Sequence, residues 1–271
     1  MRVDLSIVLP SFQAAPLARR SVSRLRSALD KLSSRWEVVV VDDGGLDFKD
    51  RSWLDGERVR LVQLPFNQGK GAAVRAGVLS CRGDVRVFTD VDLPYGTSSL
   101  APIMEYVLHR GFHVVVGDRT LSGSAYSQQV SVTRRMASSV FSQFVGRLVT
   151  GGFFDTQCGL KAFRGDVAEQ LFRLIKLQRF AFDVELIYLA LKHKLDIKRI
   201  PVRLEENSTS SVRLVRDSSR GFTDVLKIKY YQLSGAYRST ELEEIVARDY
   251  SAVAERLKGS GVAHESKVNG C

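Results

Sequence analysis

The chain has 271 residues, of which 44% are hydrophobic and 26% are charged, as in a globular protein of one large domain or two small ones. Forty Lys and Arg against thirty Asp and Glu leave a formal net charge of +10, which favours nucleic acid, a phosphorylated small molecule or an anionic membrane surface as partner. The sequence has no signal peptide, membrane span or metal-type cysteine spacing. We therefore expect a cytoplasmic protein that is soluble or, at most, peripheral at the cytoplasmic membrane face.

Short apolar runs alternate with segments of helical spacing along the first 120 residues. The runs predict strands over residues 5–9, 37–41, 59–64, 85–89 and 113–116. The spacing between them predicts helices over residues 16–32, 70–79 and 100–108. Because the strands are apolar throughout, we expect helices on both of their faces, in an α/β fold with a mostly parallel central sheet.

The second half of the chain is less regular. Its expected elements are a helix over 133–149, a loop entering a strand over 153–163, a helix over 182–194, a strand over 196–204, a flexible segment over 205–217, a helix over 221–233 and a last helix that opens at the capping residue Ser239. From residue 259 the chain is small and polar, which indicates a disordered tail.

Charged residues follow the predicted strands. In open parallel sheets, ligands bind beyond the carboxyl ends of the strands, which all lie at one edge. We therefore expect six side chains to converge there: Asp42, Asp43, Lys70, Asp90, Asp92 and Arg119.

The stretch FTDVDLPYG, residues 88–96, places Asp90 and Asp92 two positions apart at a strand end. Such carboxylates point to the same face and repel each other unless a divalent cation, a neighbouring Lys or Arg, or water lies between them. Mg²⁺ and Mn²⁺ take oxygen ligands from one or two carboxylates and from substrate phosphates. The pair therefore suits a clamp for a metal and a diphosphate, and a solvated loop tip is the alternative.

Two glycine-containing turns also suit a nucleotide. NQGKGAAVRAG, residues 67–77, lacks the spacing of a P-loop but places Lys70 at the start of a helix, where an anion binds favourably; a solvated lysine is the alternative. VVVVDDGG, residues 38–45, ends in carboxylates that suit the donors of a base or ribose. A turn with helix-capping acids is the alternative there.

In chain order, these segments resemble the inverting family 2 glycosyltransferases, and within them the branch of dolichyl-phosphate β-glucosyltransferases and polyprenyl-phosphate mannosyltransferases. The resemblance covers about residues 4–235 and rests on VLPSF, VVVDDG, NQGKGAAVRAG, FTDVDL, VVGDR, DTQCGLKAF, RFAFDVELIYLA and IKRIPVRL. The chain departs from the family pattern at Gln13-Ala14, at Gly44-Gly45 and over residues 208–213.

The resemblance implies a Rossmann-like glycosyltransferase A fold. Its catalytic domain would span residues 1–237, with a nucleotide-sugar half over 1–120 and an acceptor half over 121–237. A C-terminal helix over 238–258 and a tail over 259–271 would follow.

The resemblance also implies roles for individual residues. The nucleotide sugar would contact Pro10, Ser11, Phe12, Asp42, Asp43, Lys70, Asp90 and Arg119. Asp90 and Asp92 would hold Mg²⁺ or Mn²⁺, and Asp92, Asp155 and Asp183 are the catalytic candidates. Phosphates of the substrates would meet Arg119, Arg134, Lys161 and Arg213, the last in place of a family lysine.

The implied reaction moves a hexose, glucose before mannose, from UDP-glucose or GDP-mannose to a polyprenyl or dolichyl phosphate. The alternative is a soluble family 2 enzyme that acts on a hydroxyl of a glycan or small molecule. A hydroxyl must lose a proton, so that reaction would need Asp155 or Asp183 as a general base. A nucleic-acid-binding module is a third class, but no such motif occurs and we expect no nucleic acid partner.

Residues 213–233 combine five cations with apolar residues at helical spacing, namely Phe222, Val225, Leu226, Tyr230 and Leu233. Such a helix can lie in a membrane interface with its cations on anionic headgroups. More often, the apolar side of an amphipathic helix packs on the core of its own domain. Contact with a membrane and packing on the core are therefore both open.

Overall fold

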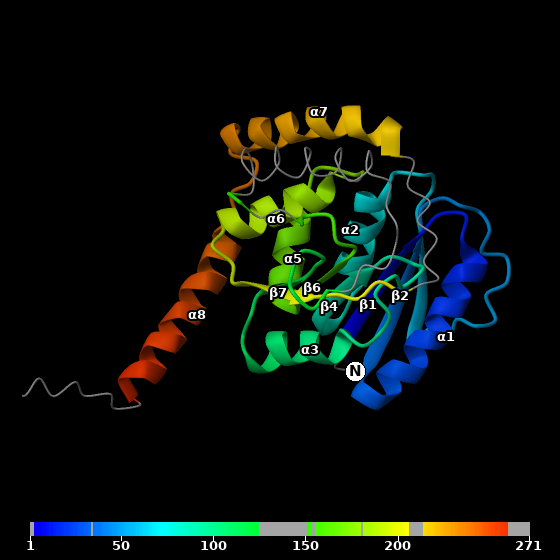
Figure 1. Cartoon of the computed structure of the whole chain (residues 1–271), viewed down its shortest axis with the longest axis horizontal. Coiled ribbons are helices and arrows are strands. Elements are labelled where there is room, and N and C mark those ends of the chain that lie inside the picture. Colours follow the sequence, from blue (N-terminus) through cyan, green and yellow to red (C-terminus); the bar gives the residue numbers. More distant parts are fainter. Residues whose placement is uncertain are drawn as a thin grey trace, which may run out of the picture.

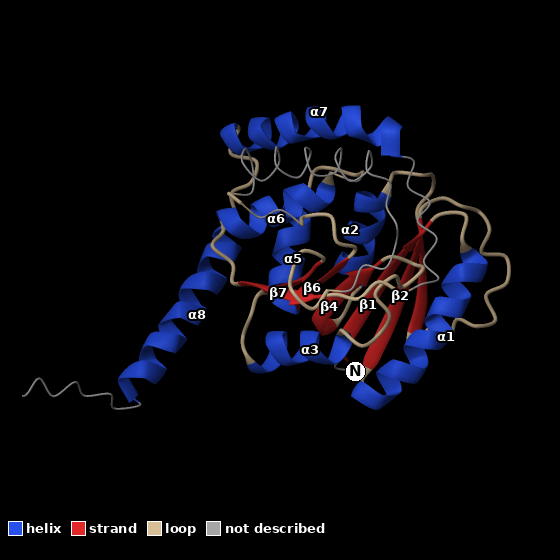
Figure 2. Cartoon of the chain, viewed as in Figure 1, coloured by secondary structure: helices blue, strands red, loops and turns tan. Residues whose placement is uncertain are grey.

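The computed structural model describes residues 3–33, 35–124, 151–152, 155–179, 181–205 and 214–259. Seven strands of the described chain form one sheet. Their order across the sheet is β3 (Val59–Gln63), β2 (Trp36–Asp42), β1 (Val3–Ser11), β4 (Gly83–Thr89), β6 (Leu160–Arg164), β5 (Val114–Asp118) and β7 (Ile197–Pro201). Helices cover both faces of this sheet (Figures 1 and 2). The predicted α/β architecture with a mostly parallel sheet is confirmed.

The first half contains every strand and helix that was predicted for it. In chain order the elements are β1 (Val3–Ser11), α1 (Ala15–Leu32), β2 (Trp36–Asp42), β3 (Val59–Gln63), α2 (Lys70–Ser80), β4 (Gly83–Thr89), α3 (Leu100–Met104), a π-helical turn η1 (Glu105–His109) and β5 (Val114–Asp118). The strands β1 to β4 are mutually parallel, with β1 between β2 and β4. Their carboxyl ends therefore share one edge of the sheet.

The valine run of β2 shows why the sheet is covered on both sides. Val38 and Val40 pack into the core beside α1 and α3. Val39 and Val41 pack into the core beside α2, α5 (Gly165–Leu174) and α6 (Phe182–Lys192). The helix α2 comes close to the sheet at Gly77, where a Cβ atom would lie 2.4 Å from Val8 Cγ1. Only glycine fits this close approach without a shift of the neighbouring side chains.

The second half adds an antiparallel strand. β6 (Leu160–Arg164) runs between β4 and β5 and is antiparallel to both, and β7 (Ile197–Pro201) lies parallel to β5 at the edge. α5 (Gly165–Leu174) and α6 (Phe182–Lys192) follow β6 in the chain. α5 was not predicted, although its buried residues recur at helical spacing: Val167, Ala168, Leu171 and Phe172.

Two long helices close the described chain, α7 (Leu214–Leu233) and α8 (Thr240–Gly259). The expected helix over 221–233 is confirmed as part of α7, but the helix already begins at Leu214, so the expectation that residues 214–217 belong to a flexible segment is wrong. Residues 206–213 of that segment lie outside the described residues. The polar residues from Arg216 to Arg220 lack an apolar period, but they contain no proline that would stop a helix. The expected helix over 133–149 and the expected tail beyond 259 lie outside the described residues.

α7 carries apolar residues on two faces. Val225 and Ile228 are buried against the core, whereas Leu226, Tyr230 and Leu233 are 65%, 67% and 87% exposed. In Figure 1, β1 and β2 run upward from the N-terminal label and α7 crosses the top of the view. No helix in the described part of the chain is long and apolar enough to cross a membrane.

Candidate donor-binding site

The ends of β1 and β2 bring two acidic residues beside Ser11. Ser11 is paired with Asp42 in the sheet, and its carbonyl oxygen accepts the N–H of Asp43 at 2.8 Å. Each carboxylate then accepts bonds from a turn: Asp42 from Gly45 N–H at 2.7 Å, and Asp43 from Gly69 N–H at 2.8 Å. The paired acids of VVVVDDGG therefore shape the two loops that border the edge of the sheet.

Burial has the largest effect on Asp43 and raises its pKa, with the neighbouring Asp42 charge acting in the same direction. Close by, two side-chain oxygens are buried without a hydrogen-bond partner in the described structure, Ser11 Oγ and Asp47 Oδ1. The second oxygen of Asp47 accepts the N–H of Ala15 at the start of α1. Two acceptors without a partner therefore lie just below the surface at this part of the edge, and the neighbouring residue Phe12 is 45% exposed.

Lys70 and Asp90 form the central ion pair of the edge, with 2.6 Å between Nζ and Oδ1. α2 begins at Lys70, and β4 ends one residue before Asp90. Burial lowers the pKa of Lys70, but the carboxylates of Asp90 and Asp183 outweigh burial and raise it, so the ammonium stays charged. A divalent cation, a basic side chain and water were the three candidates for a place beside Asp90 and Asp92. The described structure places the side chain of Lys70 there.

Asp92 lies on the turn that follows β4. Burial raises its pKa, and the nearby charge of Asp90 raises it further. The turn is tight: Leu93 has a φ of 49°, and its N–H donates to the carbonyl of Asp90 at 2.9 Å. The charge of Asp90 thus disfavours a charge on Asp92, an effect that a bound cation relieves.

Gly159, just before β6, contacts the other side of Asp90. A Cβ atom at this position would lie 2.1 Å from Asp90 Oδ2, so only glycine leaves room for the carboxylate. Sequence reasoning did not single out this residue, although the segment that contains it was recognised. The glycine brings the second half of the chain into contact with the acid pair.

Arg119 and Asp155 form a second ion pair. The backbone N–H of Arg119 donates to Oδ2 of Asp155 at 2.7 Å, and its guanidinium donates to Oδ1 at 2.6 Å. The carboxylate of Asp155 is 4% exposed, whereas the arginine side chain is 33% exposed. Arg119 therefore neutralises and holds a buried acid while part of its guanidinium remains open to a ligand.

Lys161 and Asp183 form a third pair, which is buried. Lys161 Nζ bonds to Asp183 Oδ1 and also donates to the carbonyl oxygen of Cys158 at 2.8 Å. The side chains of Lys161 and Asp183 are 0% and 3% exposed. Neither group is open to solvent, so the ammonium and carboxylate neutralise each other within the protein.

The predicted site residues therefore converge in part. Lys70, Asp90 and Asp92 meet, and Asp183 lies within electrostatic reach of Lys70. Arg119 contacts Asp155 on the same edge. Arg134 and Arg213 lie outside the described residues, so their predicted phosphate contacts remain expectations.

Asp90 and Asp92 by themselves supply only part of the ligands that a divalent cation needs. Within the described ranges, no group of three or more His, Cys, Asp or Glu side chains lies together in a way that could hold a metal ion. Two carboxylates do match the habit of Mg²⁺ and Mn²⁺, which fill their remaining positions with water and substrate phosphates. The donor set of Asp90 and Asp92 is thus consistent with a metal that arrives with a diphosphate.

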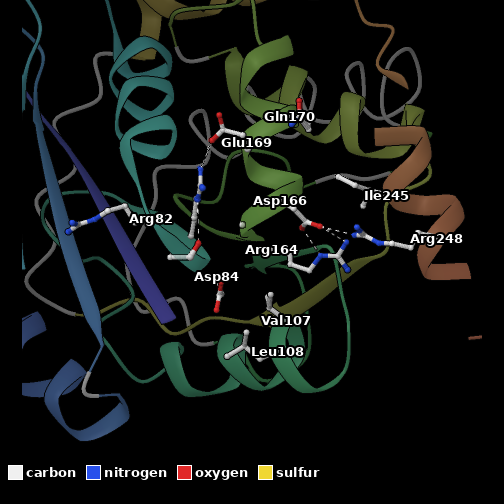
Figure 3. A pocket seen from close by; sticks show the side chains of 13 residues that line it. Arg82, Asp84, Val107, Leu108, Arg164, Asp166, Glu169, Gln170, Ile245 and Arg248 are labelled. Atoms are coloured by element: carbon white, nitrogen blue, oxygen red, sulfur yellow. Dashed lines mark hydrogen bonds and ion pairs between the residues drawn. The ribbon is translucent and has the colours of Figure 1, made fainter. Parts of the chain in front are cut away.

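A separate hollow lies at the opposite edge of the sheet, near the start of β4 (Figure 3). Its arginines are paired within the protein: Arg86 with Glu169 at 3.0 Å, and Arg164 and Arg248 with Asp166 at 2.7 and 3.1 Å. Figure 3 shows both of the latter reaching toward Asp166. None of the predicted site residues in the described part of the chain lines this hollow.

Comparison with known proteins identifies the family to which this fold belongs. The family model described as "Glycosyl transferase family 2" matches residues 6–172. The chain therefore belongs to glycosyl transferase family 2.

Two curated relatives are similar over most of their length. The dolichyl-phosphate beta-glucosyltransferase of Homo sapiens is 31% identical over 256 residues, which are 87% of this chain and 78% of the relative. The protein of the same name from Saccharomyces cerevisiae is 28% identical and covers 88% of this chain and 78% of its own length.

Solved structures share the fold. Glucosyl-3-phosphoglycerate synthase from Mycobacterium tuberculosis, in complex with Mn²⁺, UDP and phosphoglyceric acid, has a TM-score of 0.63 at 18% identity. The match covers 83% of this chain and 78% of that one. The same enzyme with Mn²⁺, UDP-glucose and phosphoglyceric acid gives a TM-score of 0.61. The predicted glycosyltransferase A fold is thus confirmed.

Proposed function

We propose that this enzyme transfers glucose from UDP-glucose to the phosphate of a polyprenol such as dolichyl phosphate, with inversion at the sugar carbon and with Mg²⁺ or Mn²⁺. Relatives named dolichyl-phosphate beta-glucosyltransferase, 28–31% identical, support the substrates. One observation on this chain carries the choice of acceptor: Asp155 and Asp183, the two candidate bases, are both held in ion pairs.

These pairs matter because acceptors differ in their need for a base. A hydroxyl must lose its proton as it attacks. The oxygens of Asp155 and Asp183 that would take this proton are already engaged by Arg119 and Lys161. A phosphate monoester is an anion at neutral pH and needs orientation and charge neutralisation instead. The site therefore favours a phosphorylated acceptor over a free hydroxyl.

For the donor, we assign the nucleoside to the ends of β1 and β2 and the diphosphate to the region of Lys70 and Asp90. The residues assigned to the nucleoside are Pro10, Ser11, Phe12, Asp42 and Asp43, and the buried oxygens there offer acceptors for base or ribose donors. Asp90 and Asp92 would hold the divalent cation, which when bound neutralises charge on the leaving diphosphate.

The transfer itself is a single displacement. An oxygen of the acceptor phosphate forms a bond to C1 of glucose while the bond from C1 to the β-phosphate of UDP breaks, and UDP leaves with the electron pair. Lys70, charged because its pKa is raised, stabilises the phosphates, and the open part of the Arg119 guanidinium is available to a second phosphate. We assign the acceptor phosphate to the surroundings of Arg119, with Arg134 and Arg213 as further candidates.

The acceptor's lipid tail requires contact with a membrane. The exposed residues Leu226, Tyr230 and Leu233 follow one another at helical spacing on α7, and Lys227 and Lys229 adjoin them. We assign this face, called here the α7 outer face, to the surface of an anionic membrane, because its apolar residues suit the acyl boundary and its cations the headgroups. Val225 and Ile228 meanwhile hold the helix to the core.

A thermal-shift screen tests the donor. UDP-glucose, UDP-galactose, GDP-mannose and UDP alone are added with and without Mn²⁺. A ligand at 100 times its dissociation constant stabilises the fold by about 2.7 kcal/mol, which raises the melting temperature of a protein this large by about 5–10 °C. We expect the largest rise with UDP-glucose and Mn²⁺ together. A rise in melting temperature with GDP-mannose, and with none of the uridine nucleotides, would contradict the choice of donor.

A further inference from the structure

The cation position beside Asp90 already has an occupant. Lys70 Nζ lies 2.6 Å from Asp90 Oδ1, and the lysine side chain is only 16% exposed. Gly159 lies against Oδ2 so closely that a Cβ atom there would be 2.1 Å away. The Asp90 side chain is 37% exposed, so the ammonium of Lys70, rather than burial, occupies the place of a cation at Oδ1.

The other possible metal ligands near Asp90 are too few to offset the loss of its bond to Lys70. Asp92 is the other carboxylate of the pair, and the described residues bring no third His, Cys, Asp or Glu to it. A divalent cation that arrives alone would have to displace the ammonium of Lys70 and would gain only one further carboxylate. Such a site holds a hard cation weakly, because most of its oxygen ligands are missing.

A bound diphosphate changes both the number of metal ligands and the partner of Lys70. Its oxygens add ligands for the cation, and its negative charge offers the Lys70 ammonium a partner to replace Asp90. We infer that Lys70 occupies the cation position of the free enzyme and keeps Asp90 from binding a metal until a nucleotide diphosphate takes over the ammonium. Metal and donor then bind as one unit, and this inference rests on the proposed donor.

The test measures Mn²⁺ binding directly, by the electron paramagnetic resonance signal of free Mn²⁺ in titrations with and without UDP. The variant Lys70→Met removes the ammonium but keeps an unbranched chain. Lys70→Arg keeps the charge. Lys192→Met is the matched control, because that lysine is exposed and lies in the last turn of α6, at the other end of the helix from Asp183. Melting temperatures show whether each variant is folded.

We expect Lys70→Met to bind Mn²⁺ without UDP about tenfold more tightly than the unmodified enzyme, because one positive charge next to a ligand oxygen is gone. UDP should raise the Mn²⁺ affinity of the unmodified enzyme strongly and that of Lys70→Met much less. Lys70→Arg and Lys192→Met should behave like the unmodified enzyme.

Equal Mn²⁺ affinity of Lys70→Met and the unmodified enzyme in the absence of UDP would overturn the inference. Tighter binding by Lys70→Met, with no effect of UDP on either protein, would support competition between lysine and metal and would instead contradict the proposed donor.

Discussion

The guanidinium and backbone amide of Arg119 both bond to the carboxylate of Asp155, at 2.6 and 2.7 Å, and leave that acid 4% exposed. Asp155 lies in the segment that leads to β6, whereas Arg119 follows β5, so the pair joins two separate parts of the chain. The proposed role of Asp155 is therefore to position Arg119.

This role predicts that the two residues act as a unit. Asp155→Asn and Arg119→Gln should each lower kcat/KM, and the double variant should be little worse than the more damaging single one. Residues in one ion-pair network typically show coupling energies of about 0.5–3 kcal/mol. Additive losses, or a loss for Asp155→Asn far above that for Arg119→Gln together with a new acidic limb in the pH profile, would point to a general base instead.

Gly159→Ala tests the packing against the acid pair. The added methyl group would meet Asp90 Oδ2 at 2.1 Å, so we expect the affinity for UDP-glucose with Mn²⁺ to fall by about tenfold or more. Gly111→Ala is the control: it has a φ of +74° and open space around it, and it should cost about 1 kcal/mol of stability without affecting the donor. Isothermal titration measures the donor affinity of both variants. Equal donor affinities of Gly159→Ala and the unmodified enzyme would contradict the prediction.

Glu37 predicts how stability depends on pH. It is buried in β2, where burial would raise its pKa, but bonds from the Arg82 backbone, Ser6, Arg60 and the Arg82 side chain together hold the pKa below its ordinary value. The stabilisation is therefore present above the unfolded pKa, about 4.3, and is lost as the pH falls through the lower folded value.

Glu37→Gln should accordingly lower the free energy of unfolding by roughly 2–3 kcal/mol at pH 7, because it leaves buried charged donors without their acceptor. Urea unfolding of both proteins between pH 7 and pH 3 measures the difference, which should be constant above about pH 5 and shrink below it. Glu105→Gln, in an exposed pair with Arg110, should change stability by less than about 0.5 kcal/mol. A difference that does not vary with pH would refute this account of Glu37.

The α7 outer face predicts salt-sensitive binding to vesicles. We expect sedimentation with vesicles that contain phosphatidylserine at low salt, less of it at high salt, and a further loss in Lys227→Glu with Lys229→Glu, since each cation contributes about 1 kcal/mol near such a surface. Leu226→Glu should also release the protein. Tyr250→Glu on α8, another exposed aromatic position, should not. Protein that stays in the supernatant at low salt would contradict the assignment.

The positions of the strands in the first half of the chain, and the acidic edge at which they end, could be predicted from the sequence because both depend on local patterns. Val38 to Val41 must be buried on both sides, and residues at the ends of parallel strands must meet. The antiparallel direction of β6 was not predictable, because a five-residue apolar strand carries no signal for its direction.

Partners of charged residues were harder to predict. Arg119 was expected to meet a phosphate, yet its pairing with Asp155 depends on how the segment before β6 approaches β5, which no local pattern encodes. The phosphate contacts of Arg119 and Lys161, and the division into nucleotide and acceptor halves at residue 120, remain predictions.

The most direct test of the account is the product of the reaction. The enzyme is incubated with Mn²⁺, UDP-glucose labelled in the sugar and a polyprenyl phosphate in detergent, next to a panel of soluble hydroxyl acceptors and 3-phosphoglycerate. We predict that label enters the organic phase as a β-glucosyl phosphate of the polyprenol, and that Asp92→Asn abolishes this transfer. Label that stays in the aqueous phase with the polyprenyl phosphate, while a soluble hydroxyl acceptor becomes glucosylated, would contradict the proposed function.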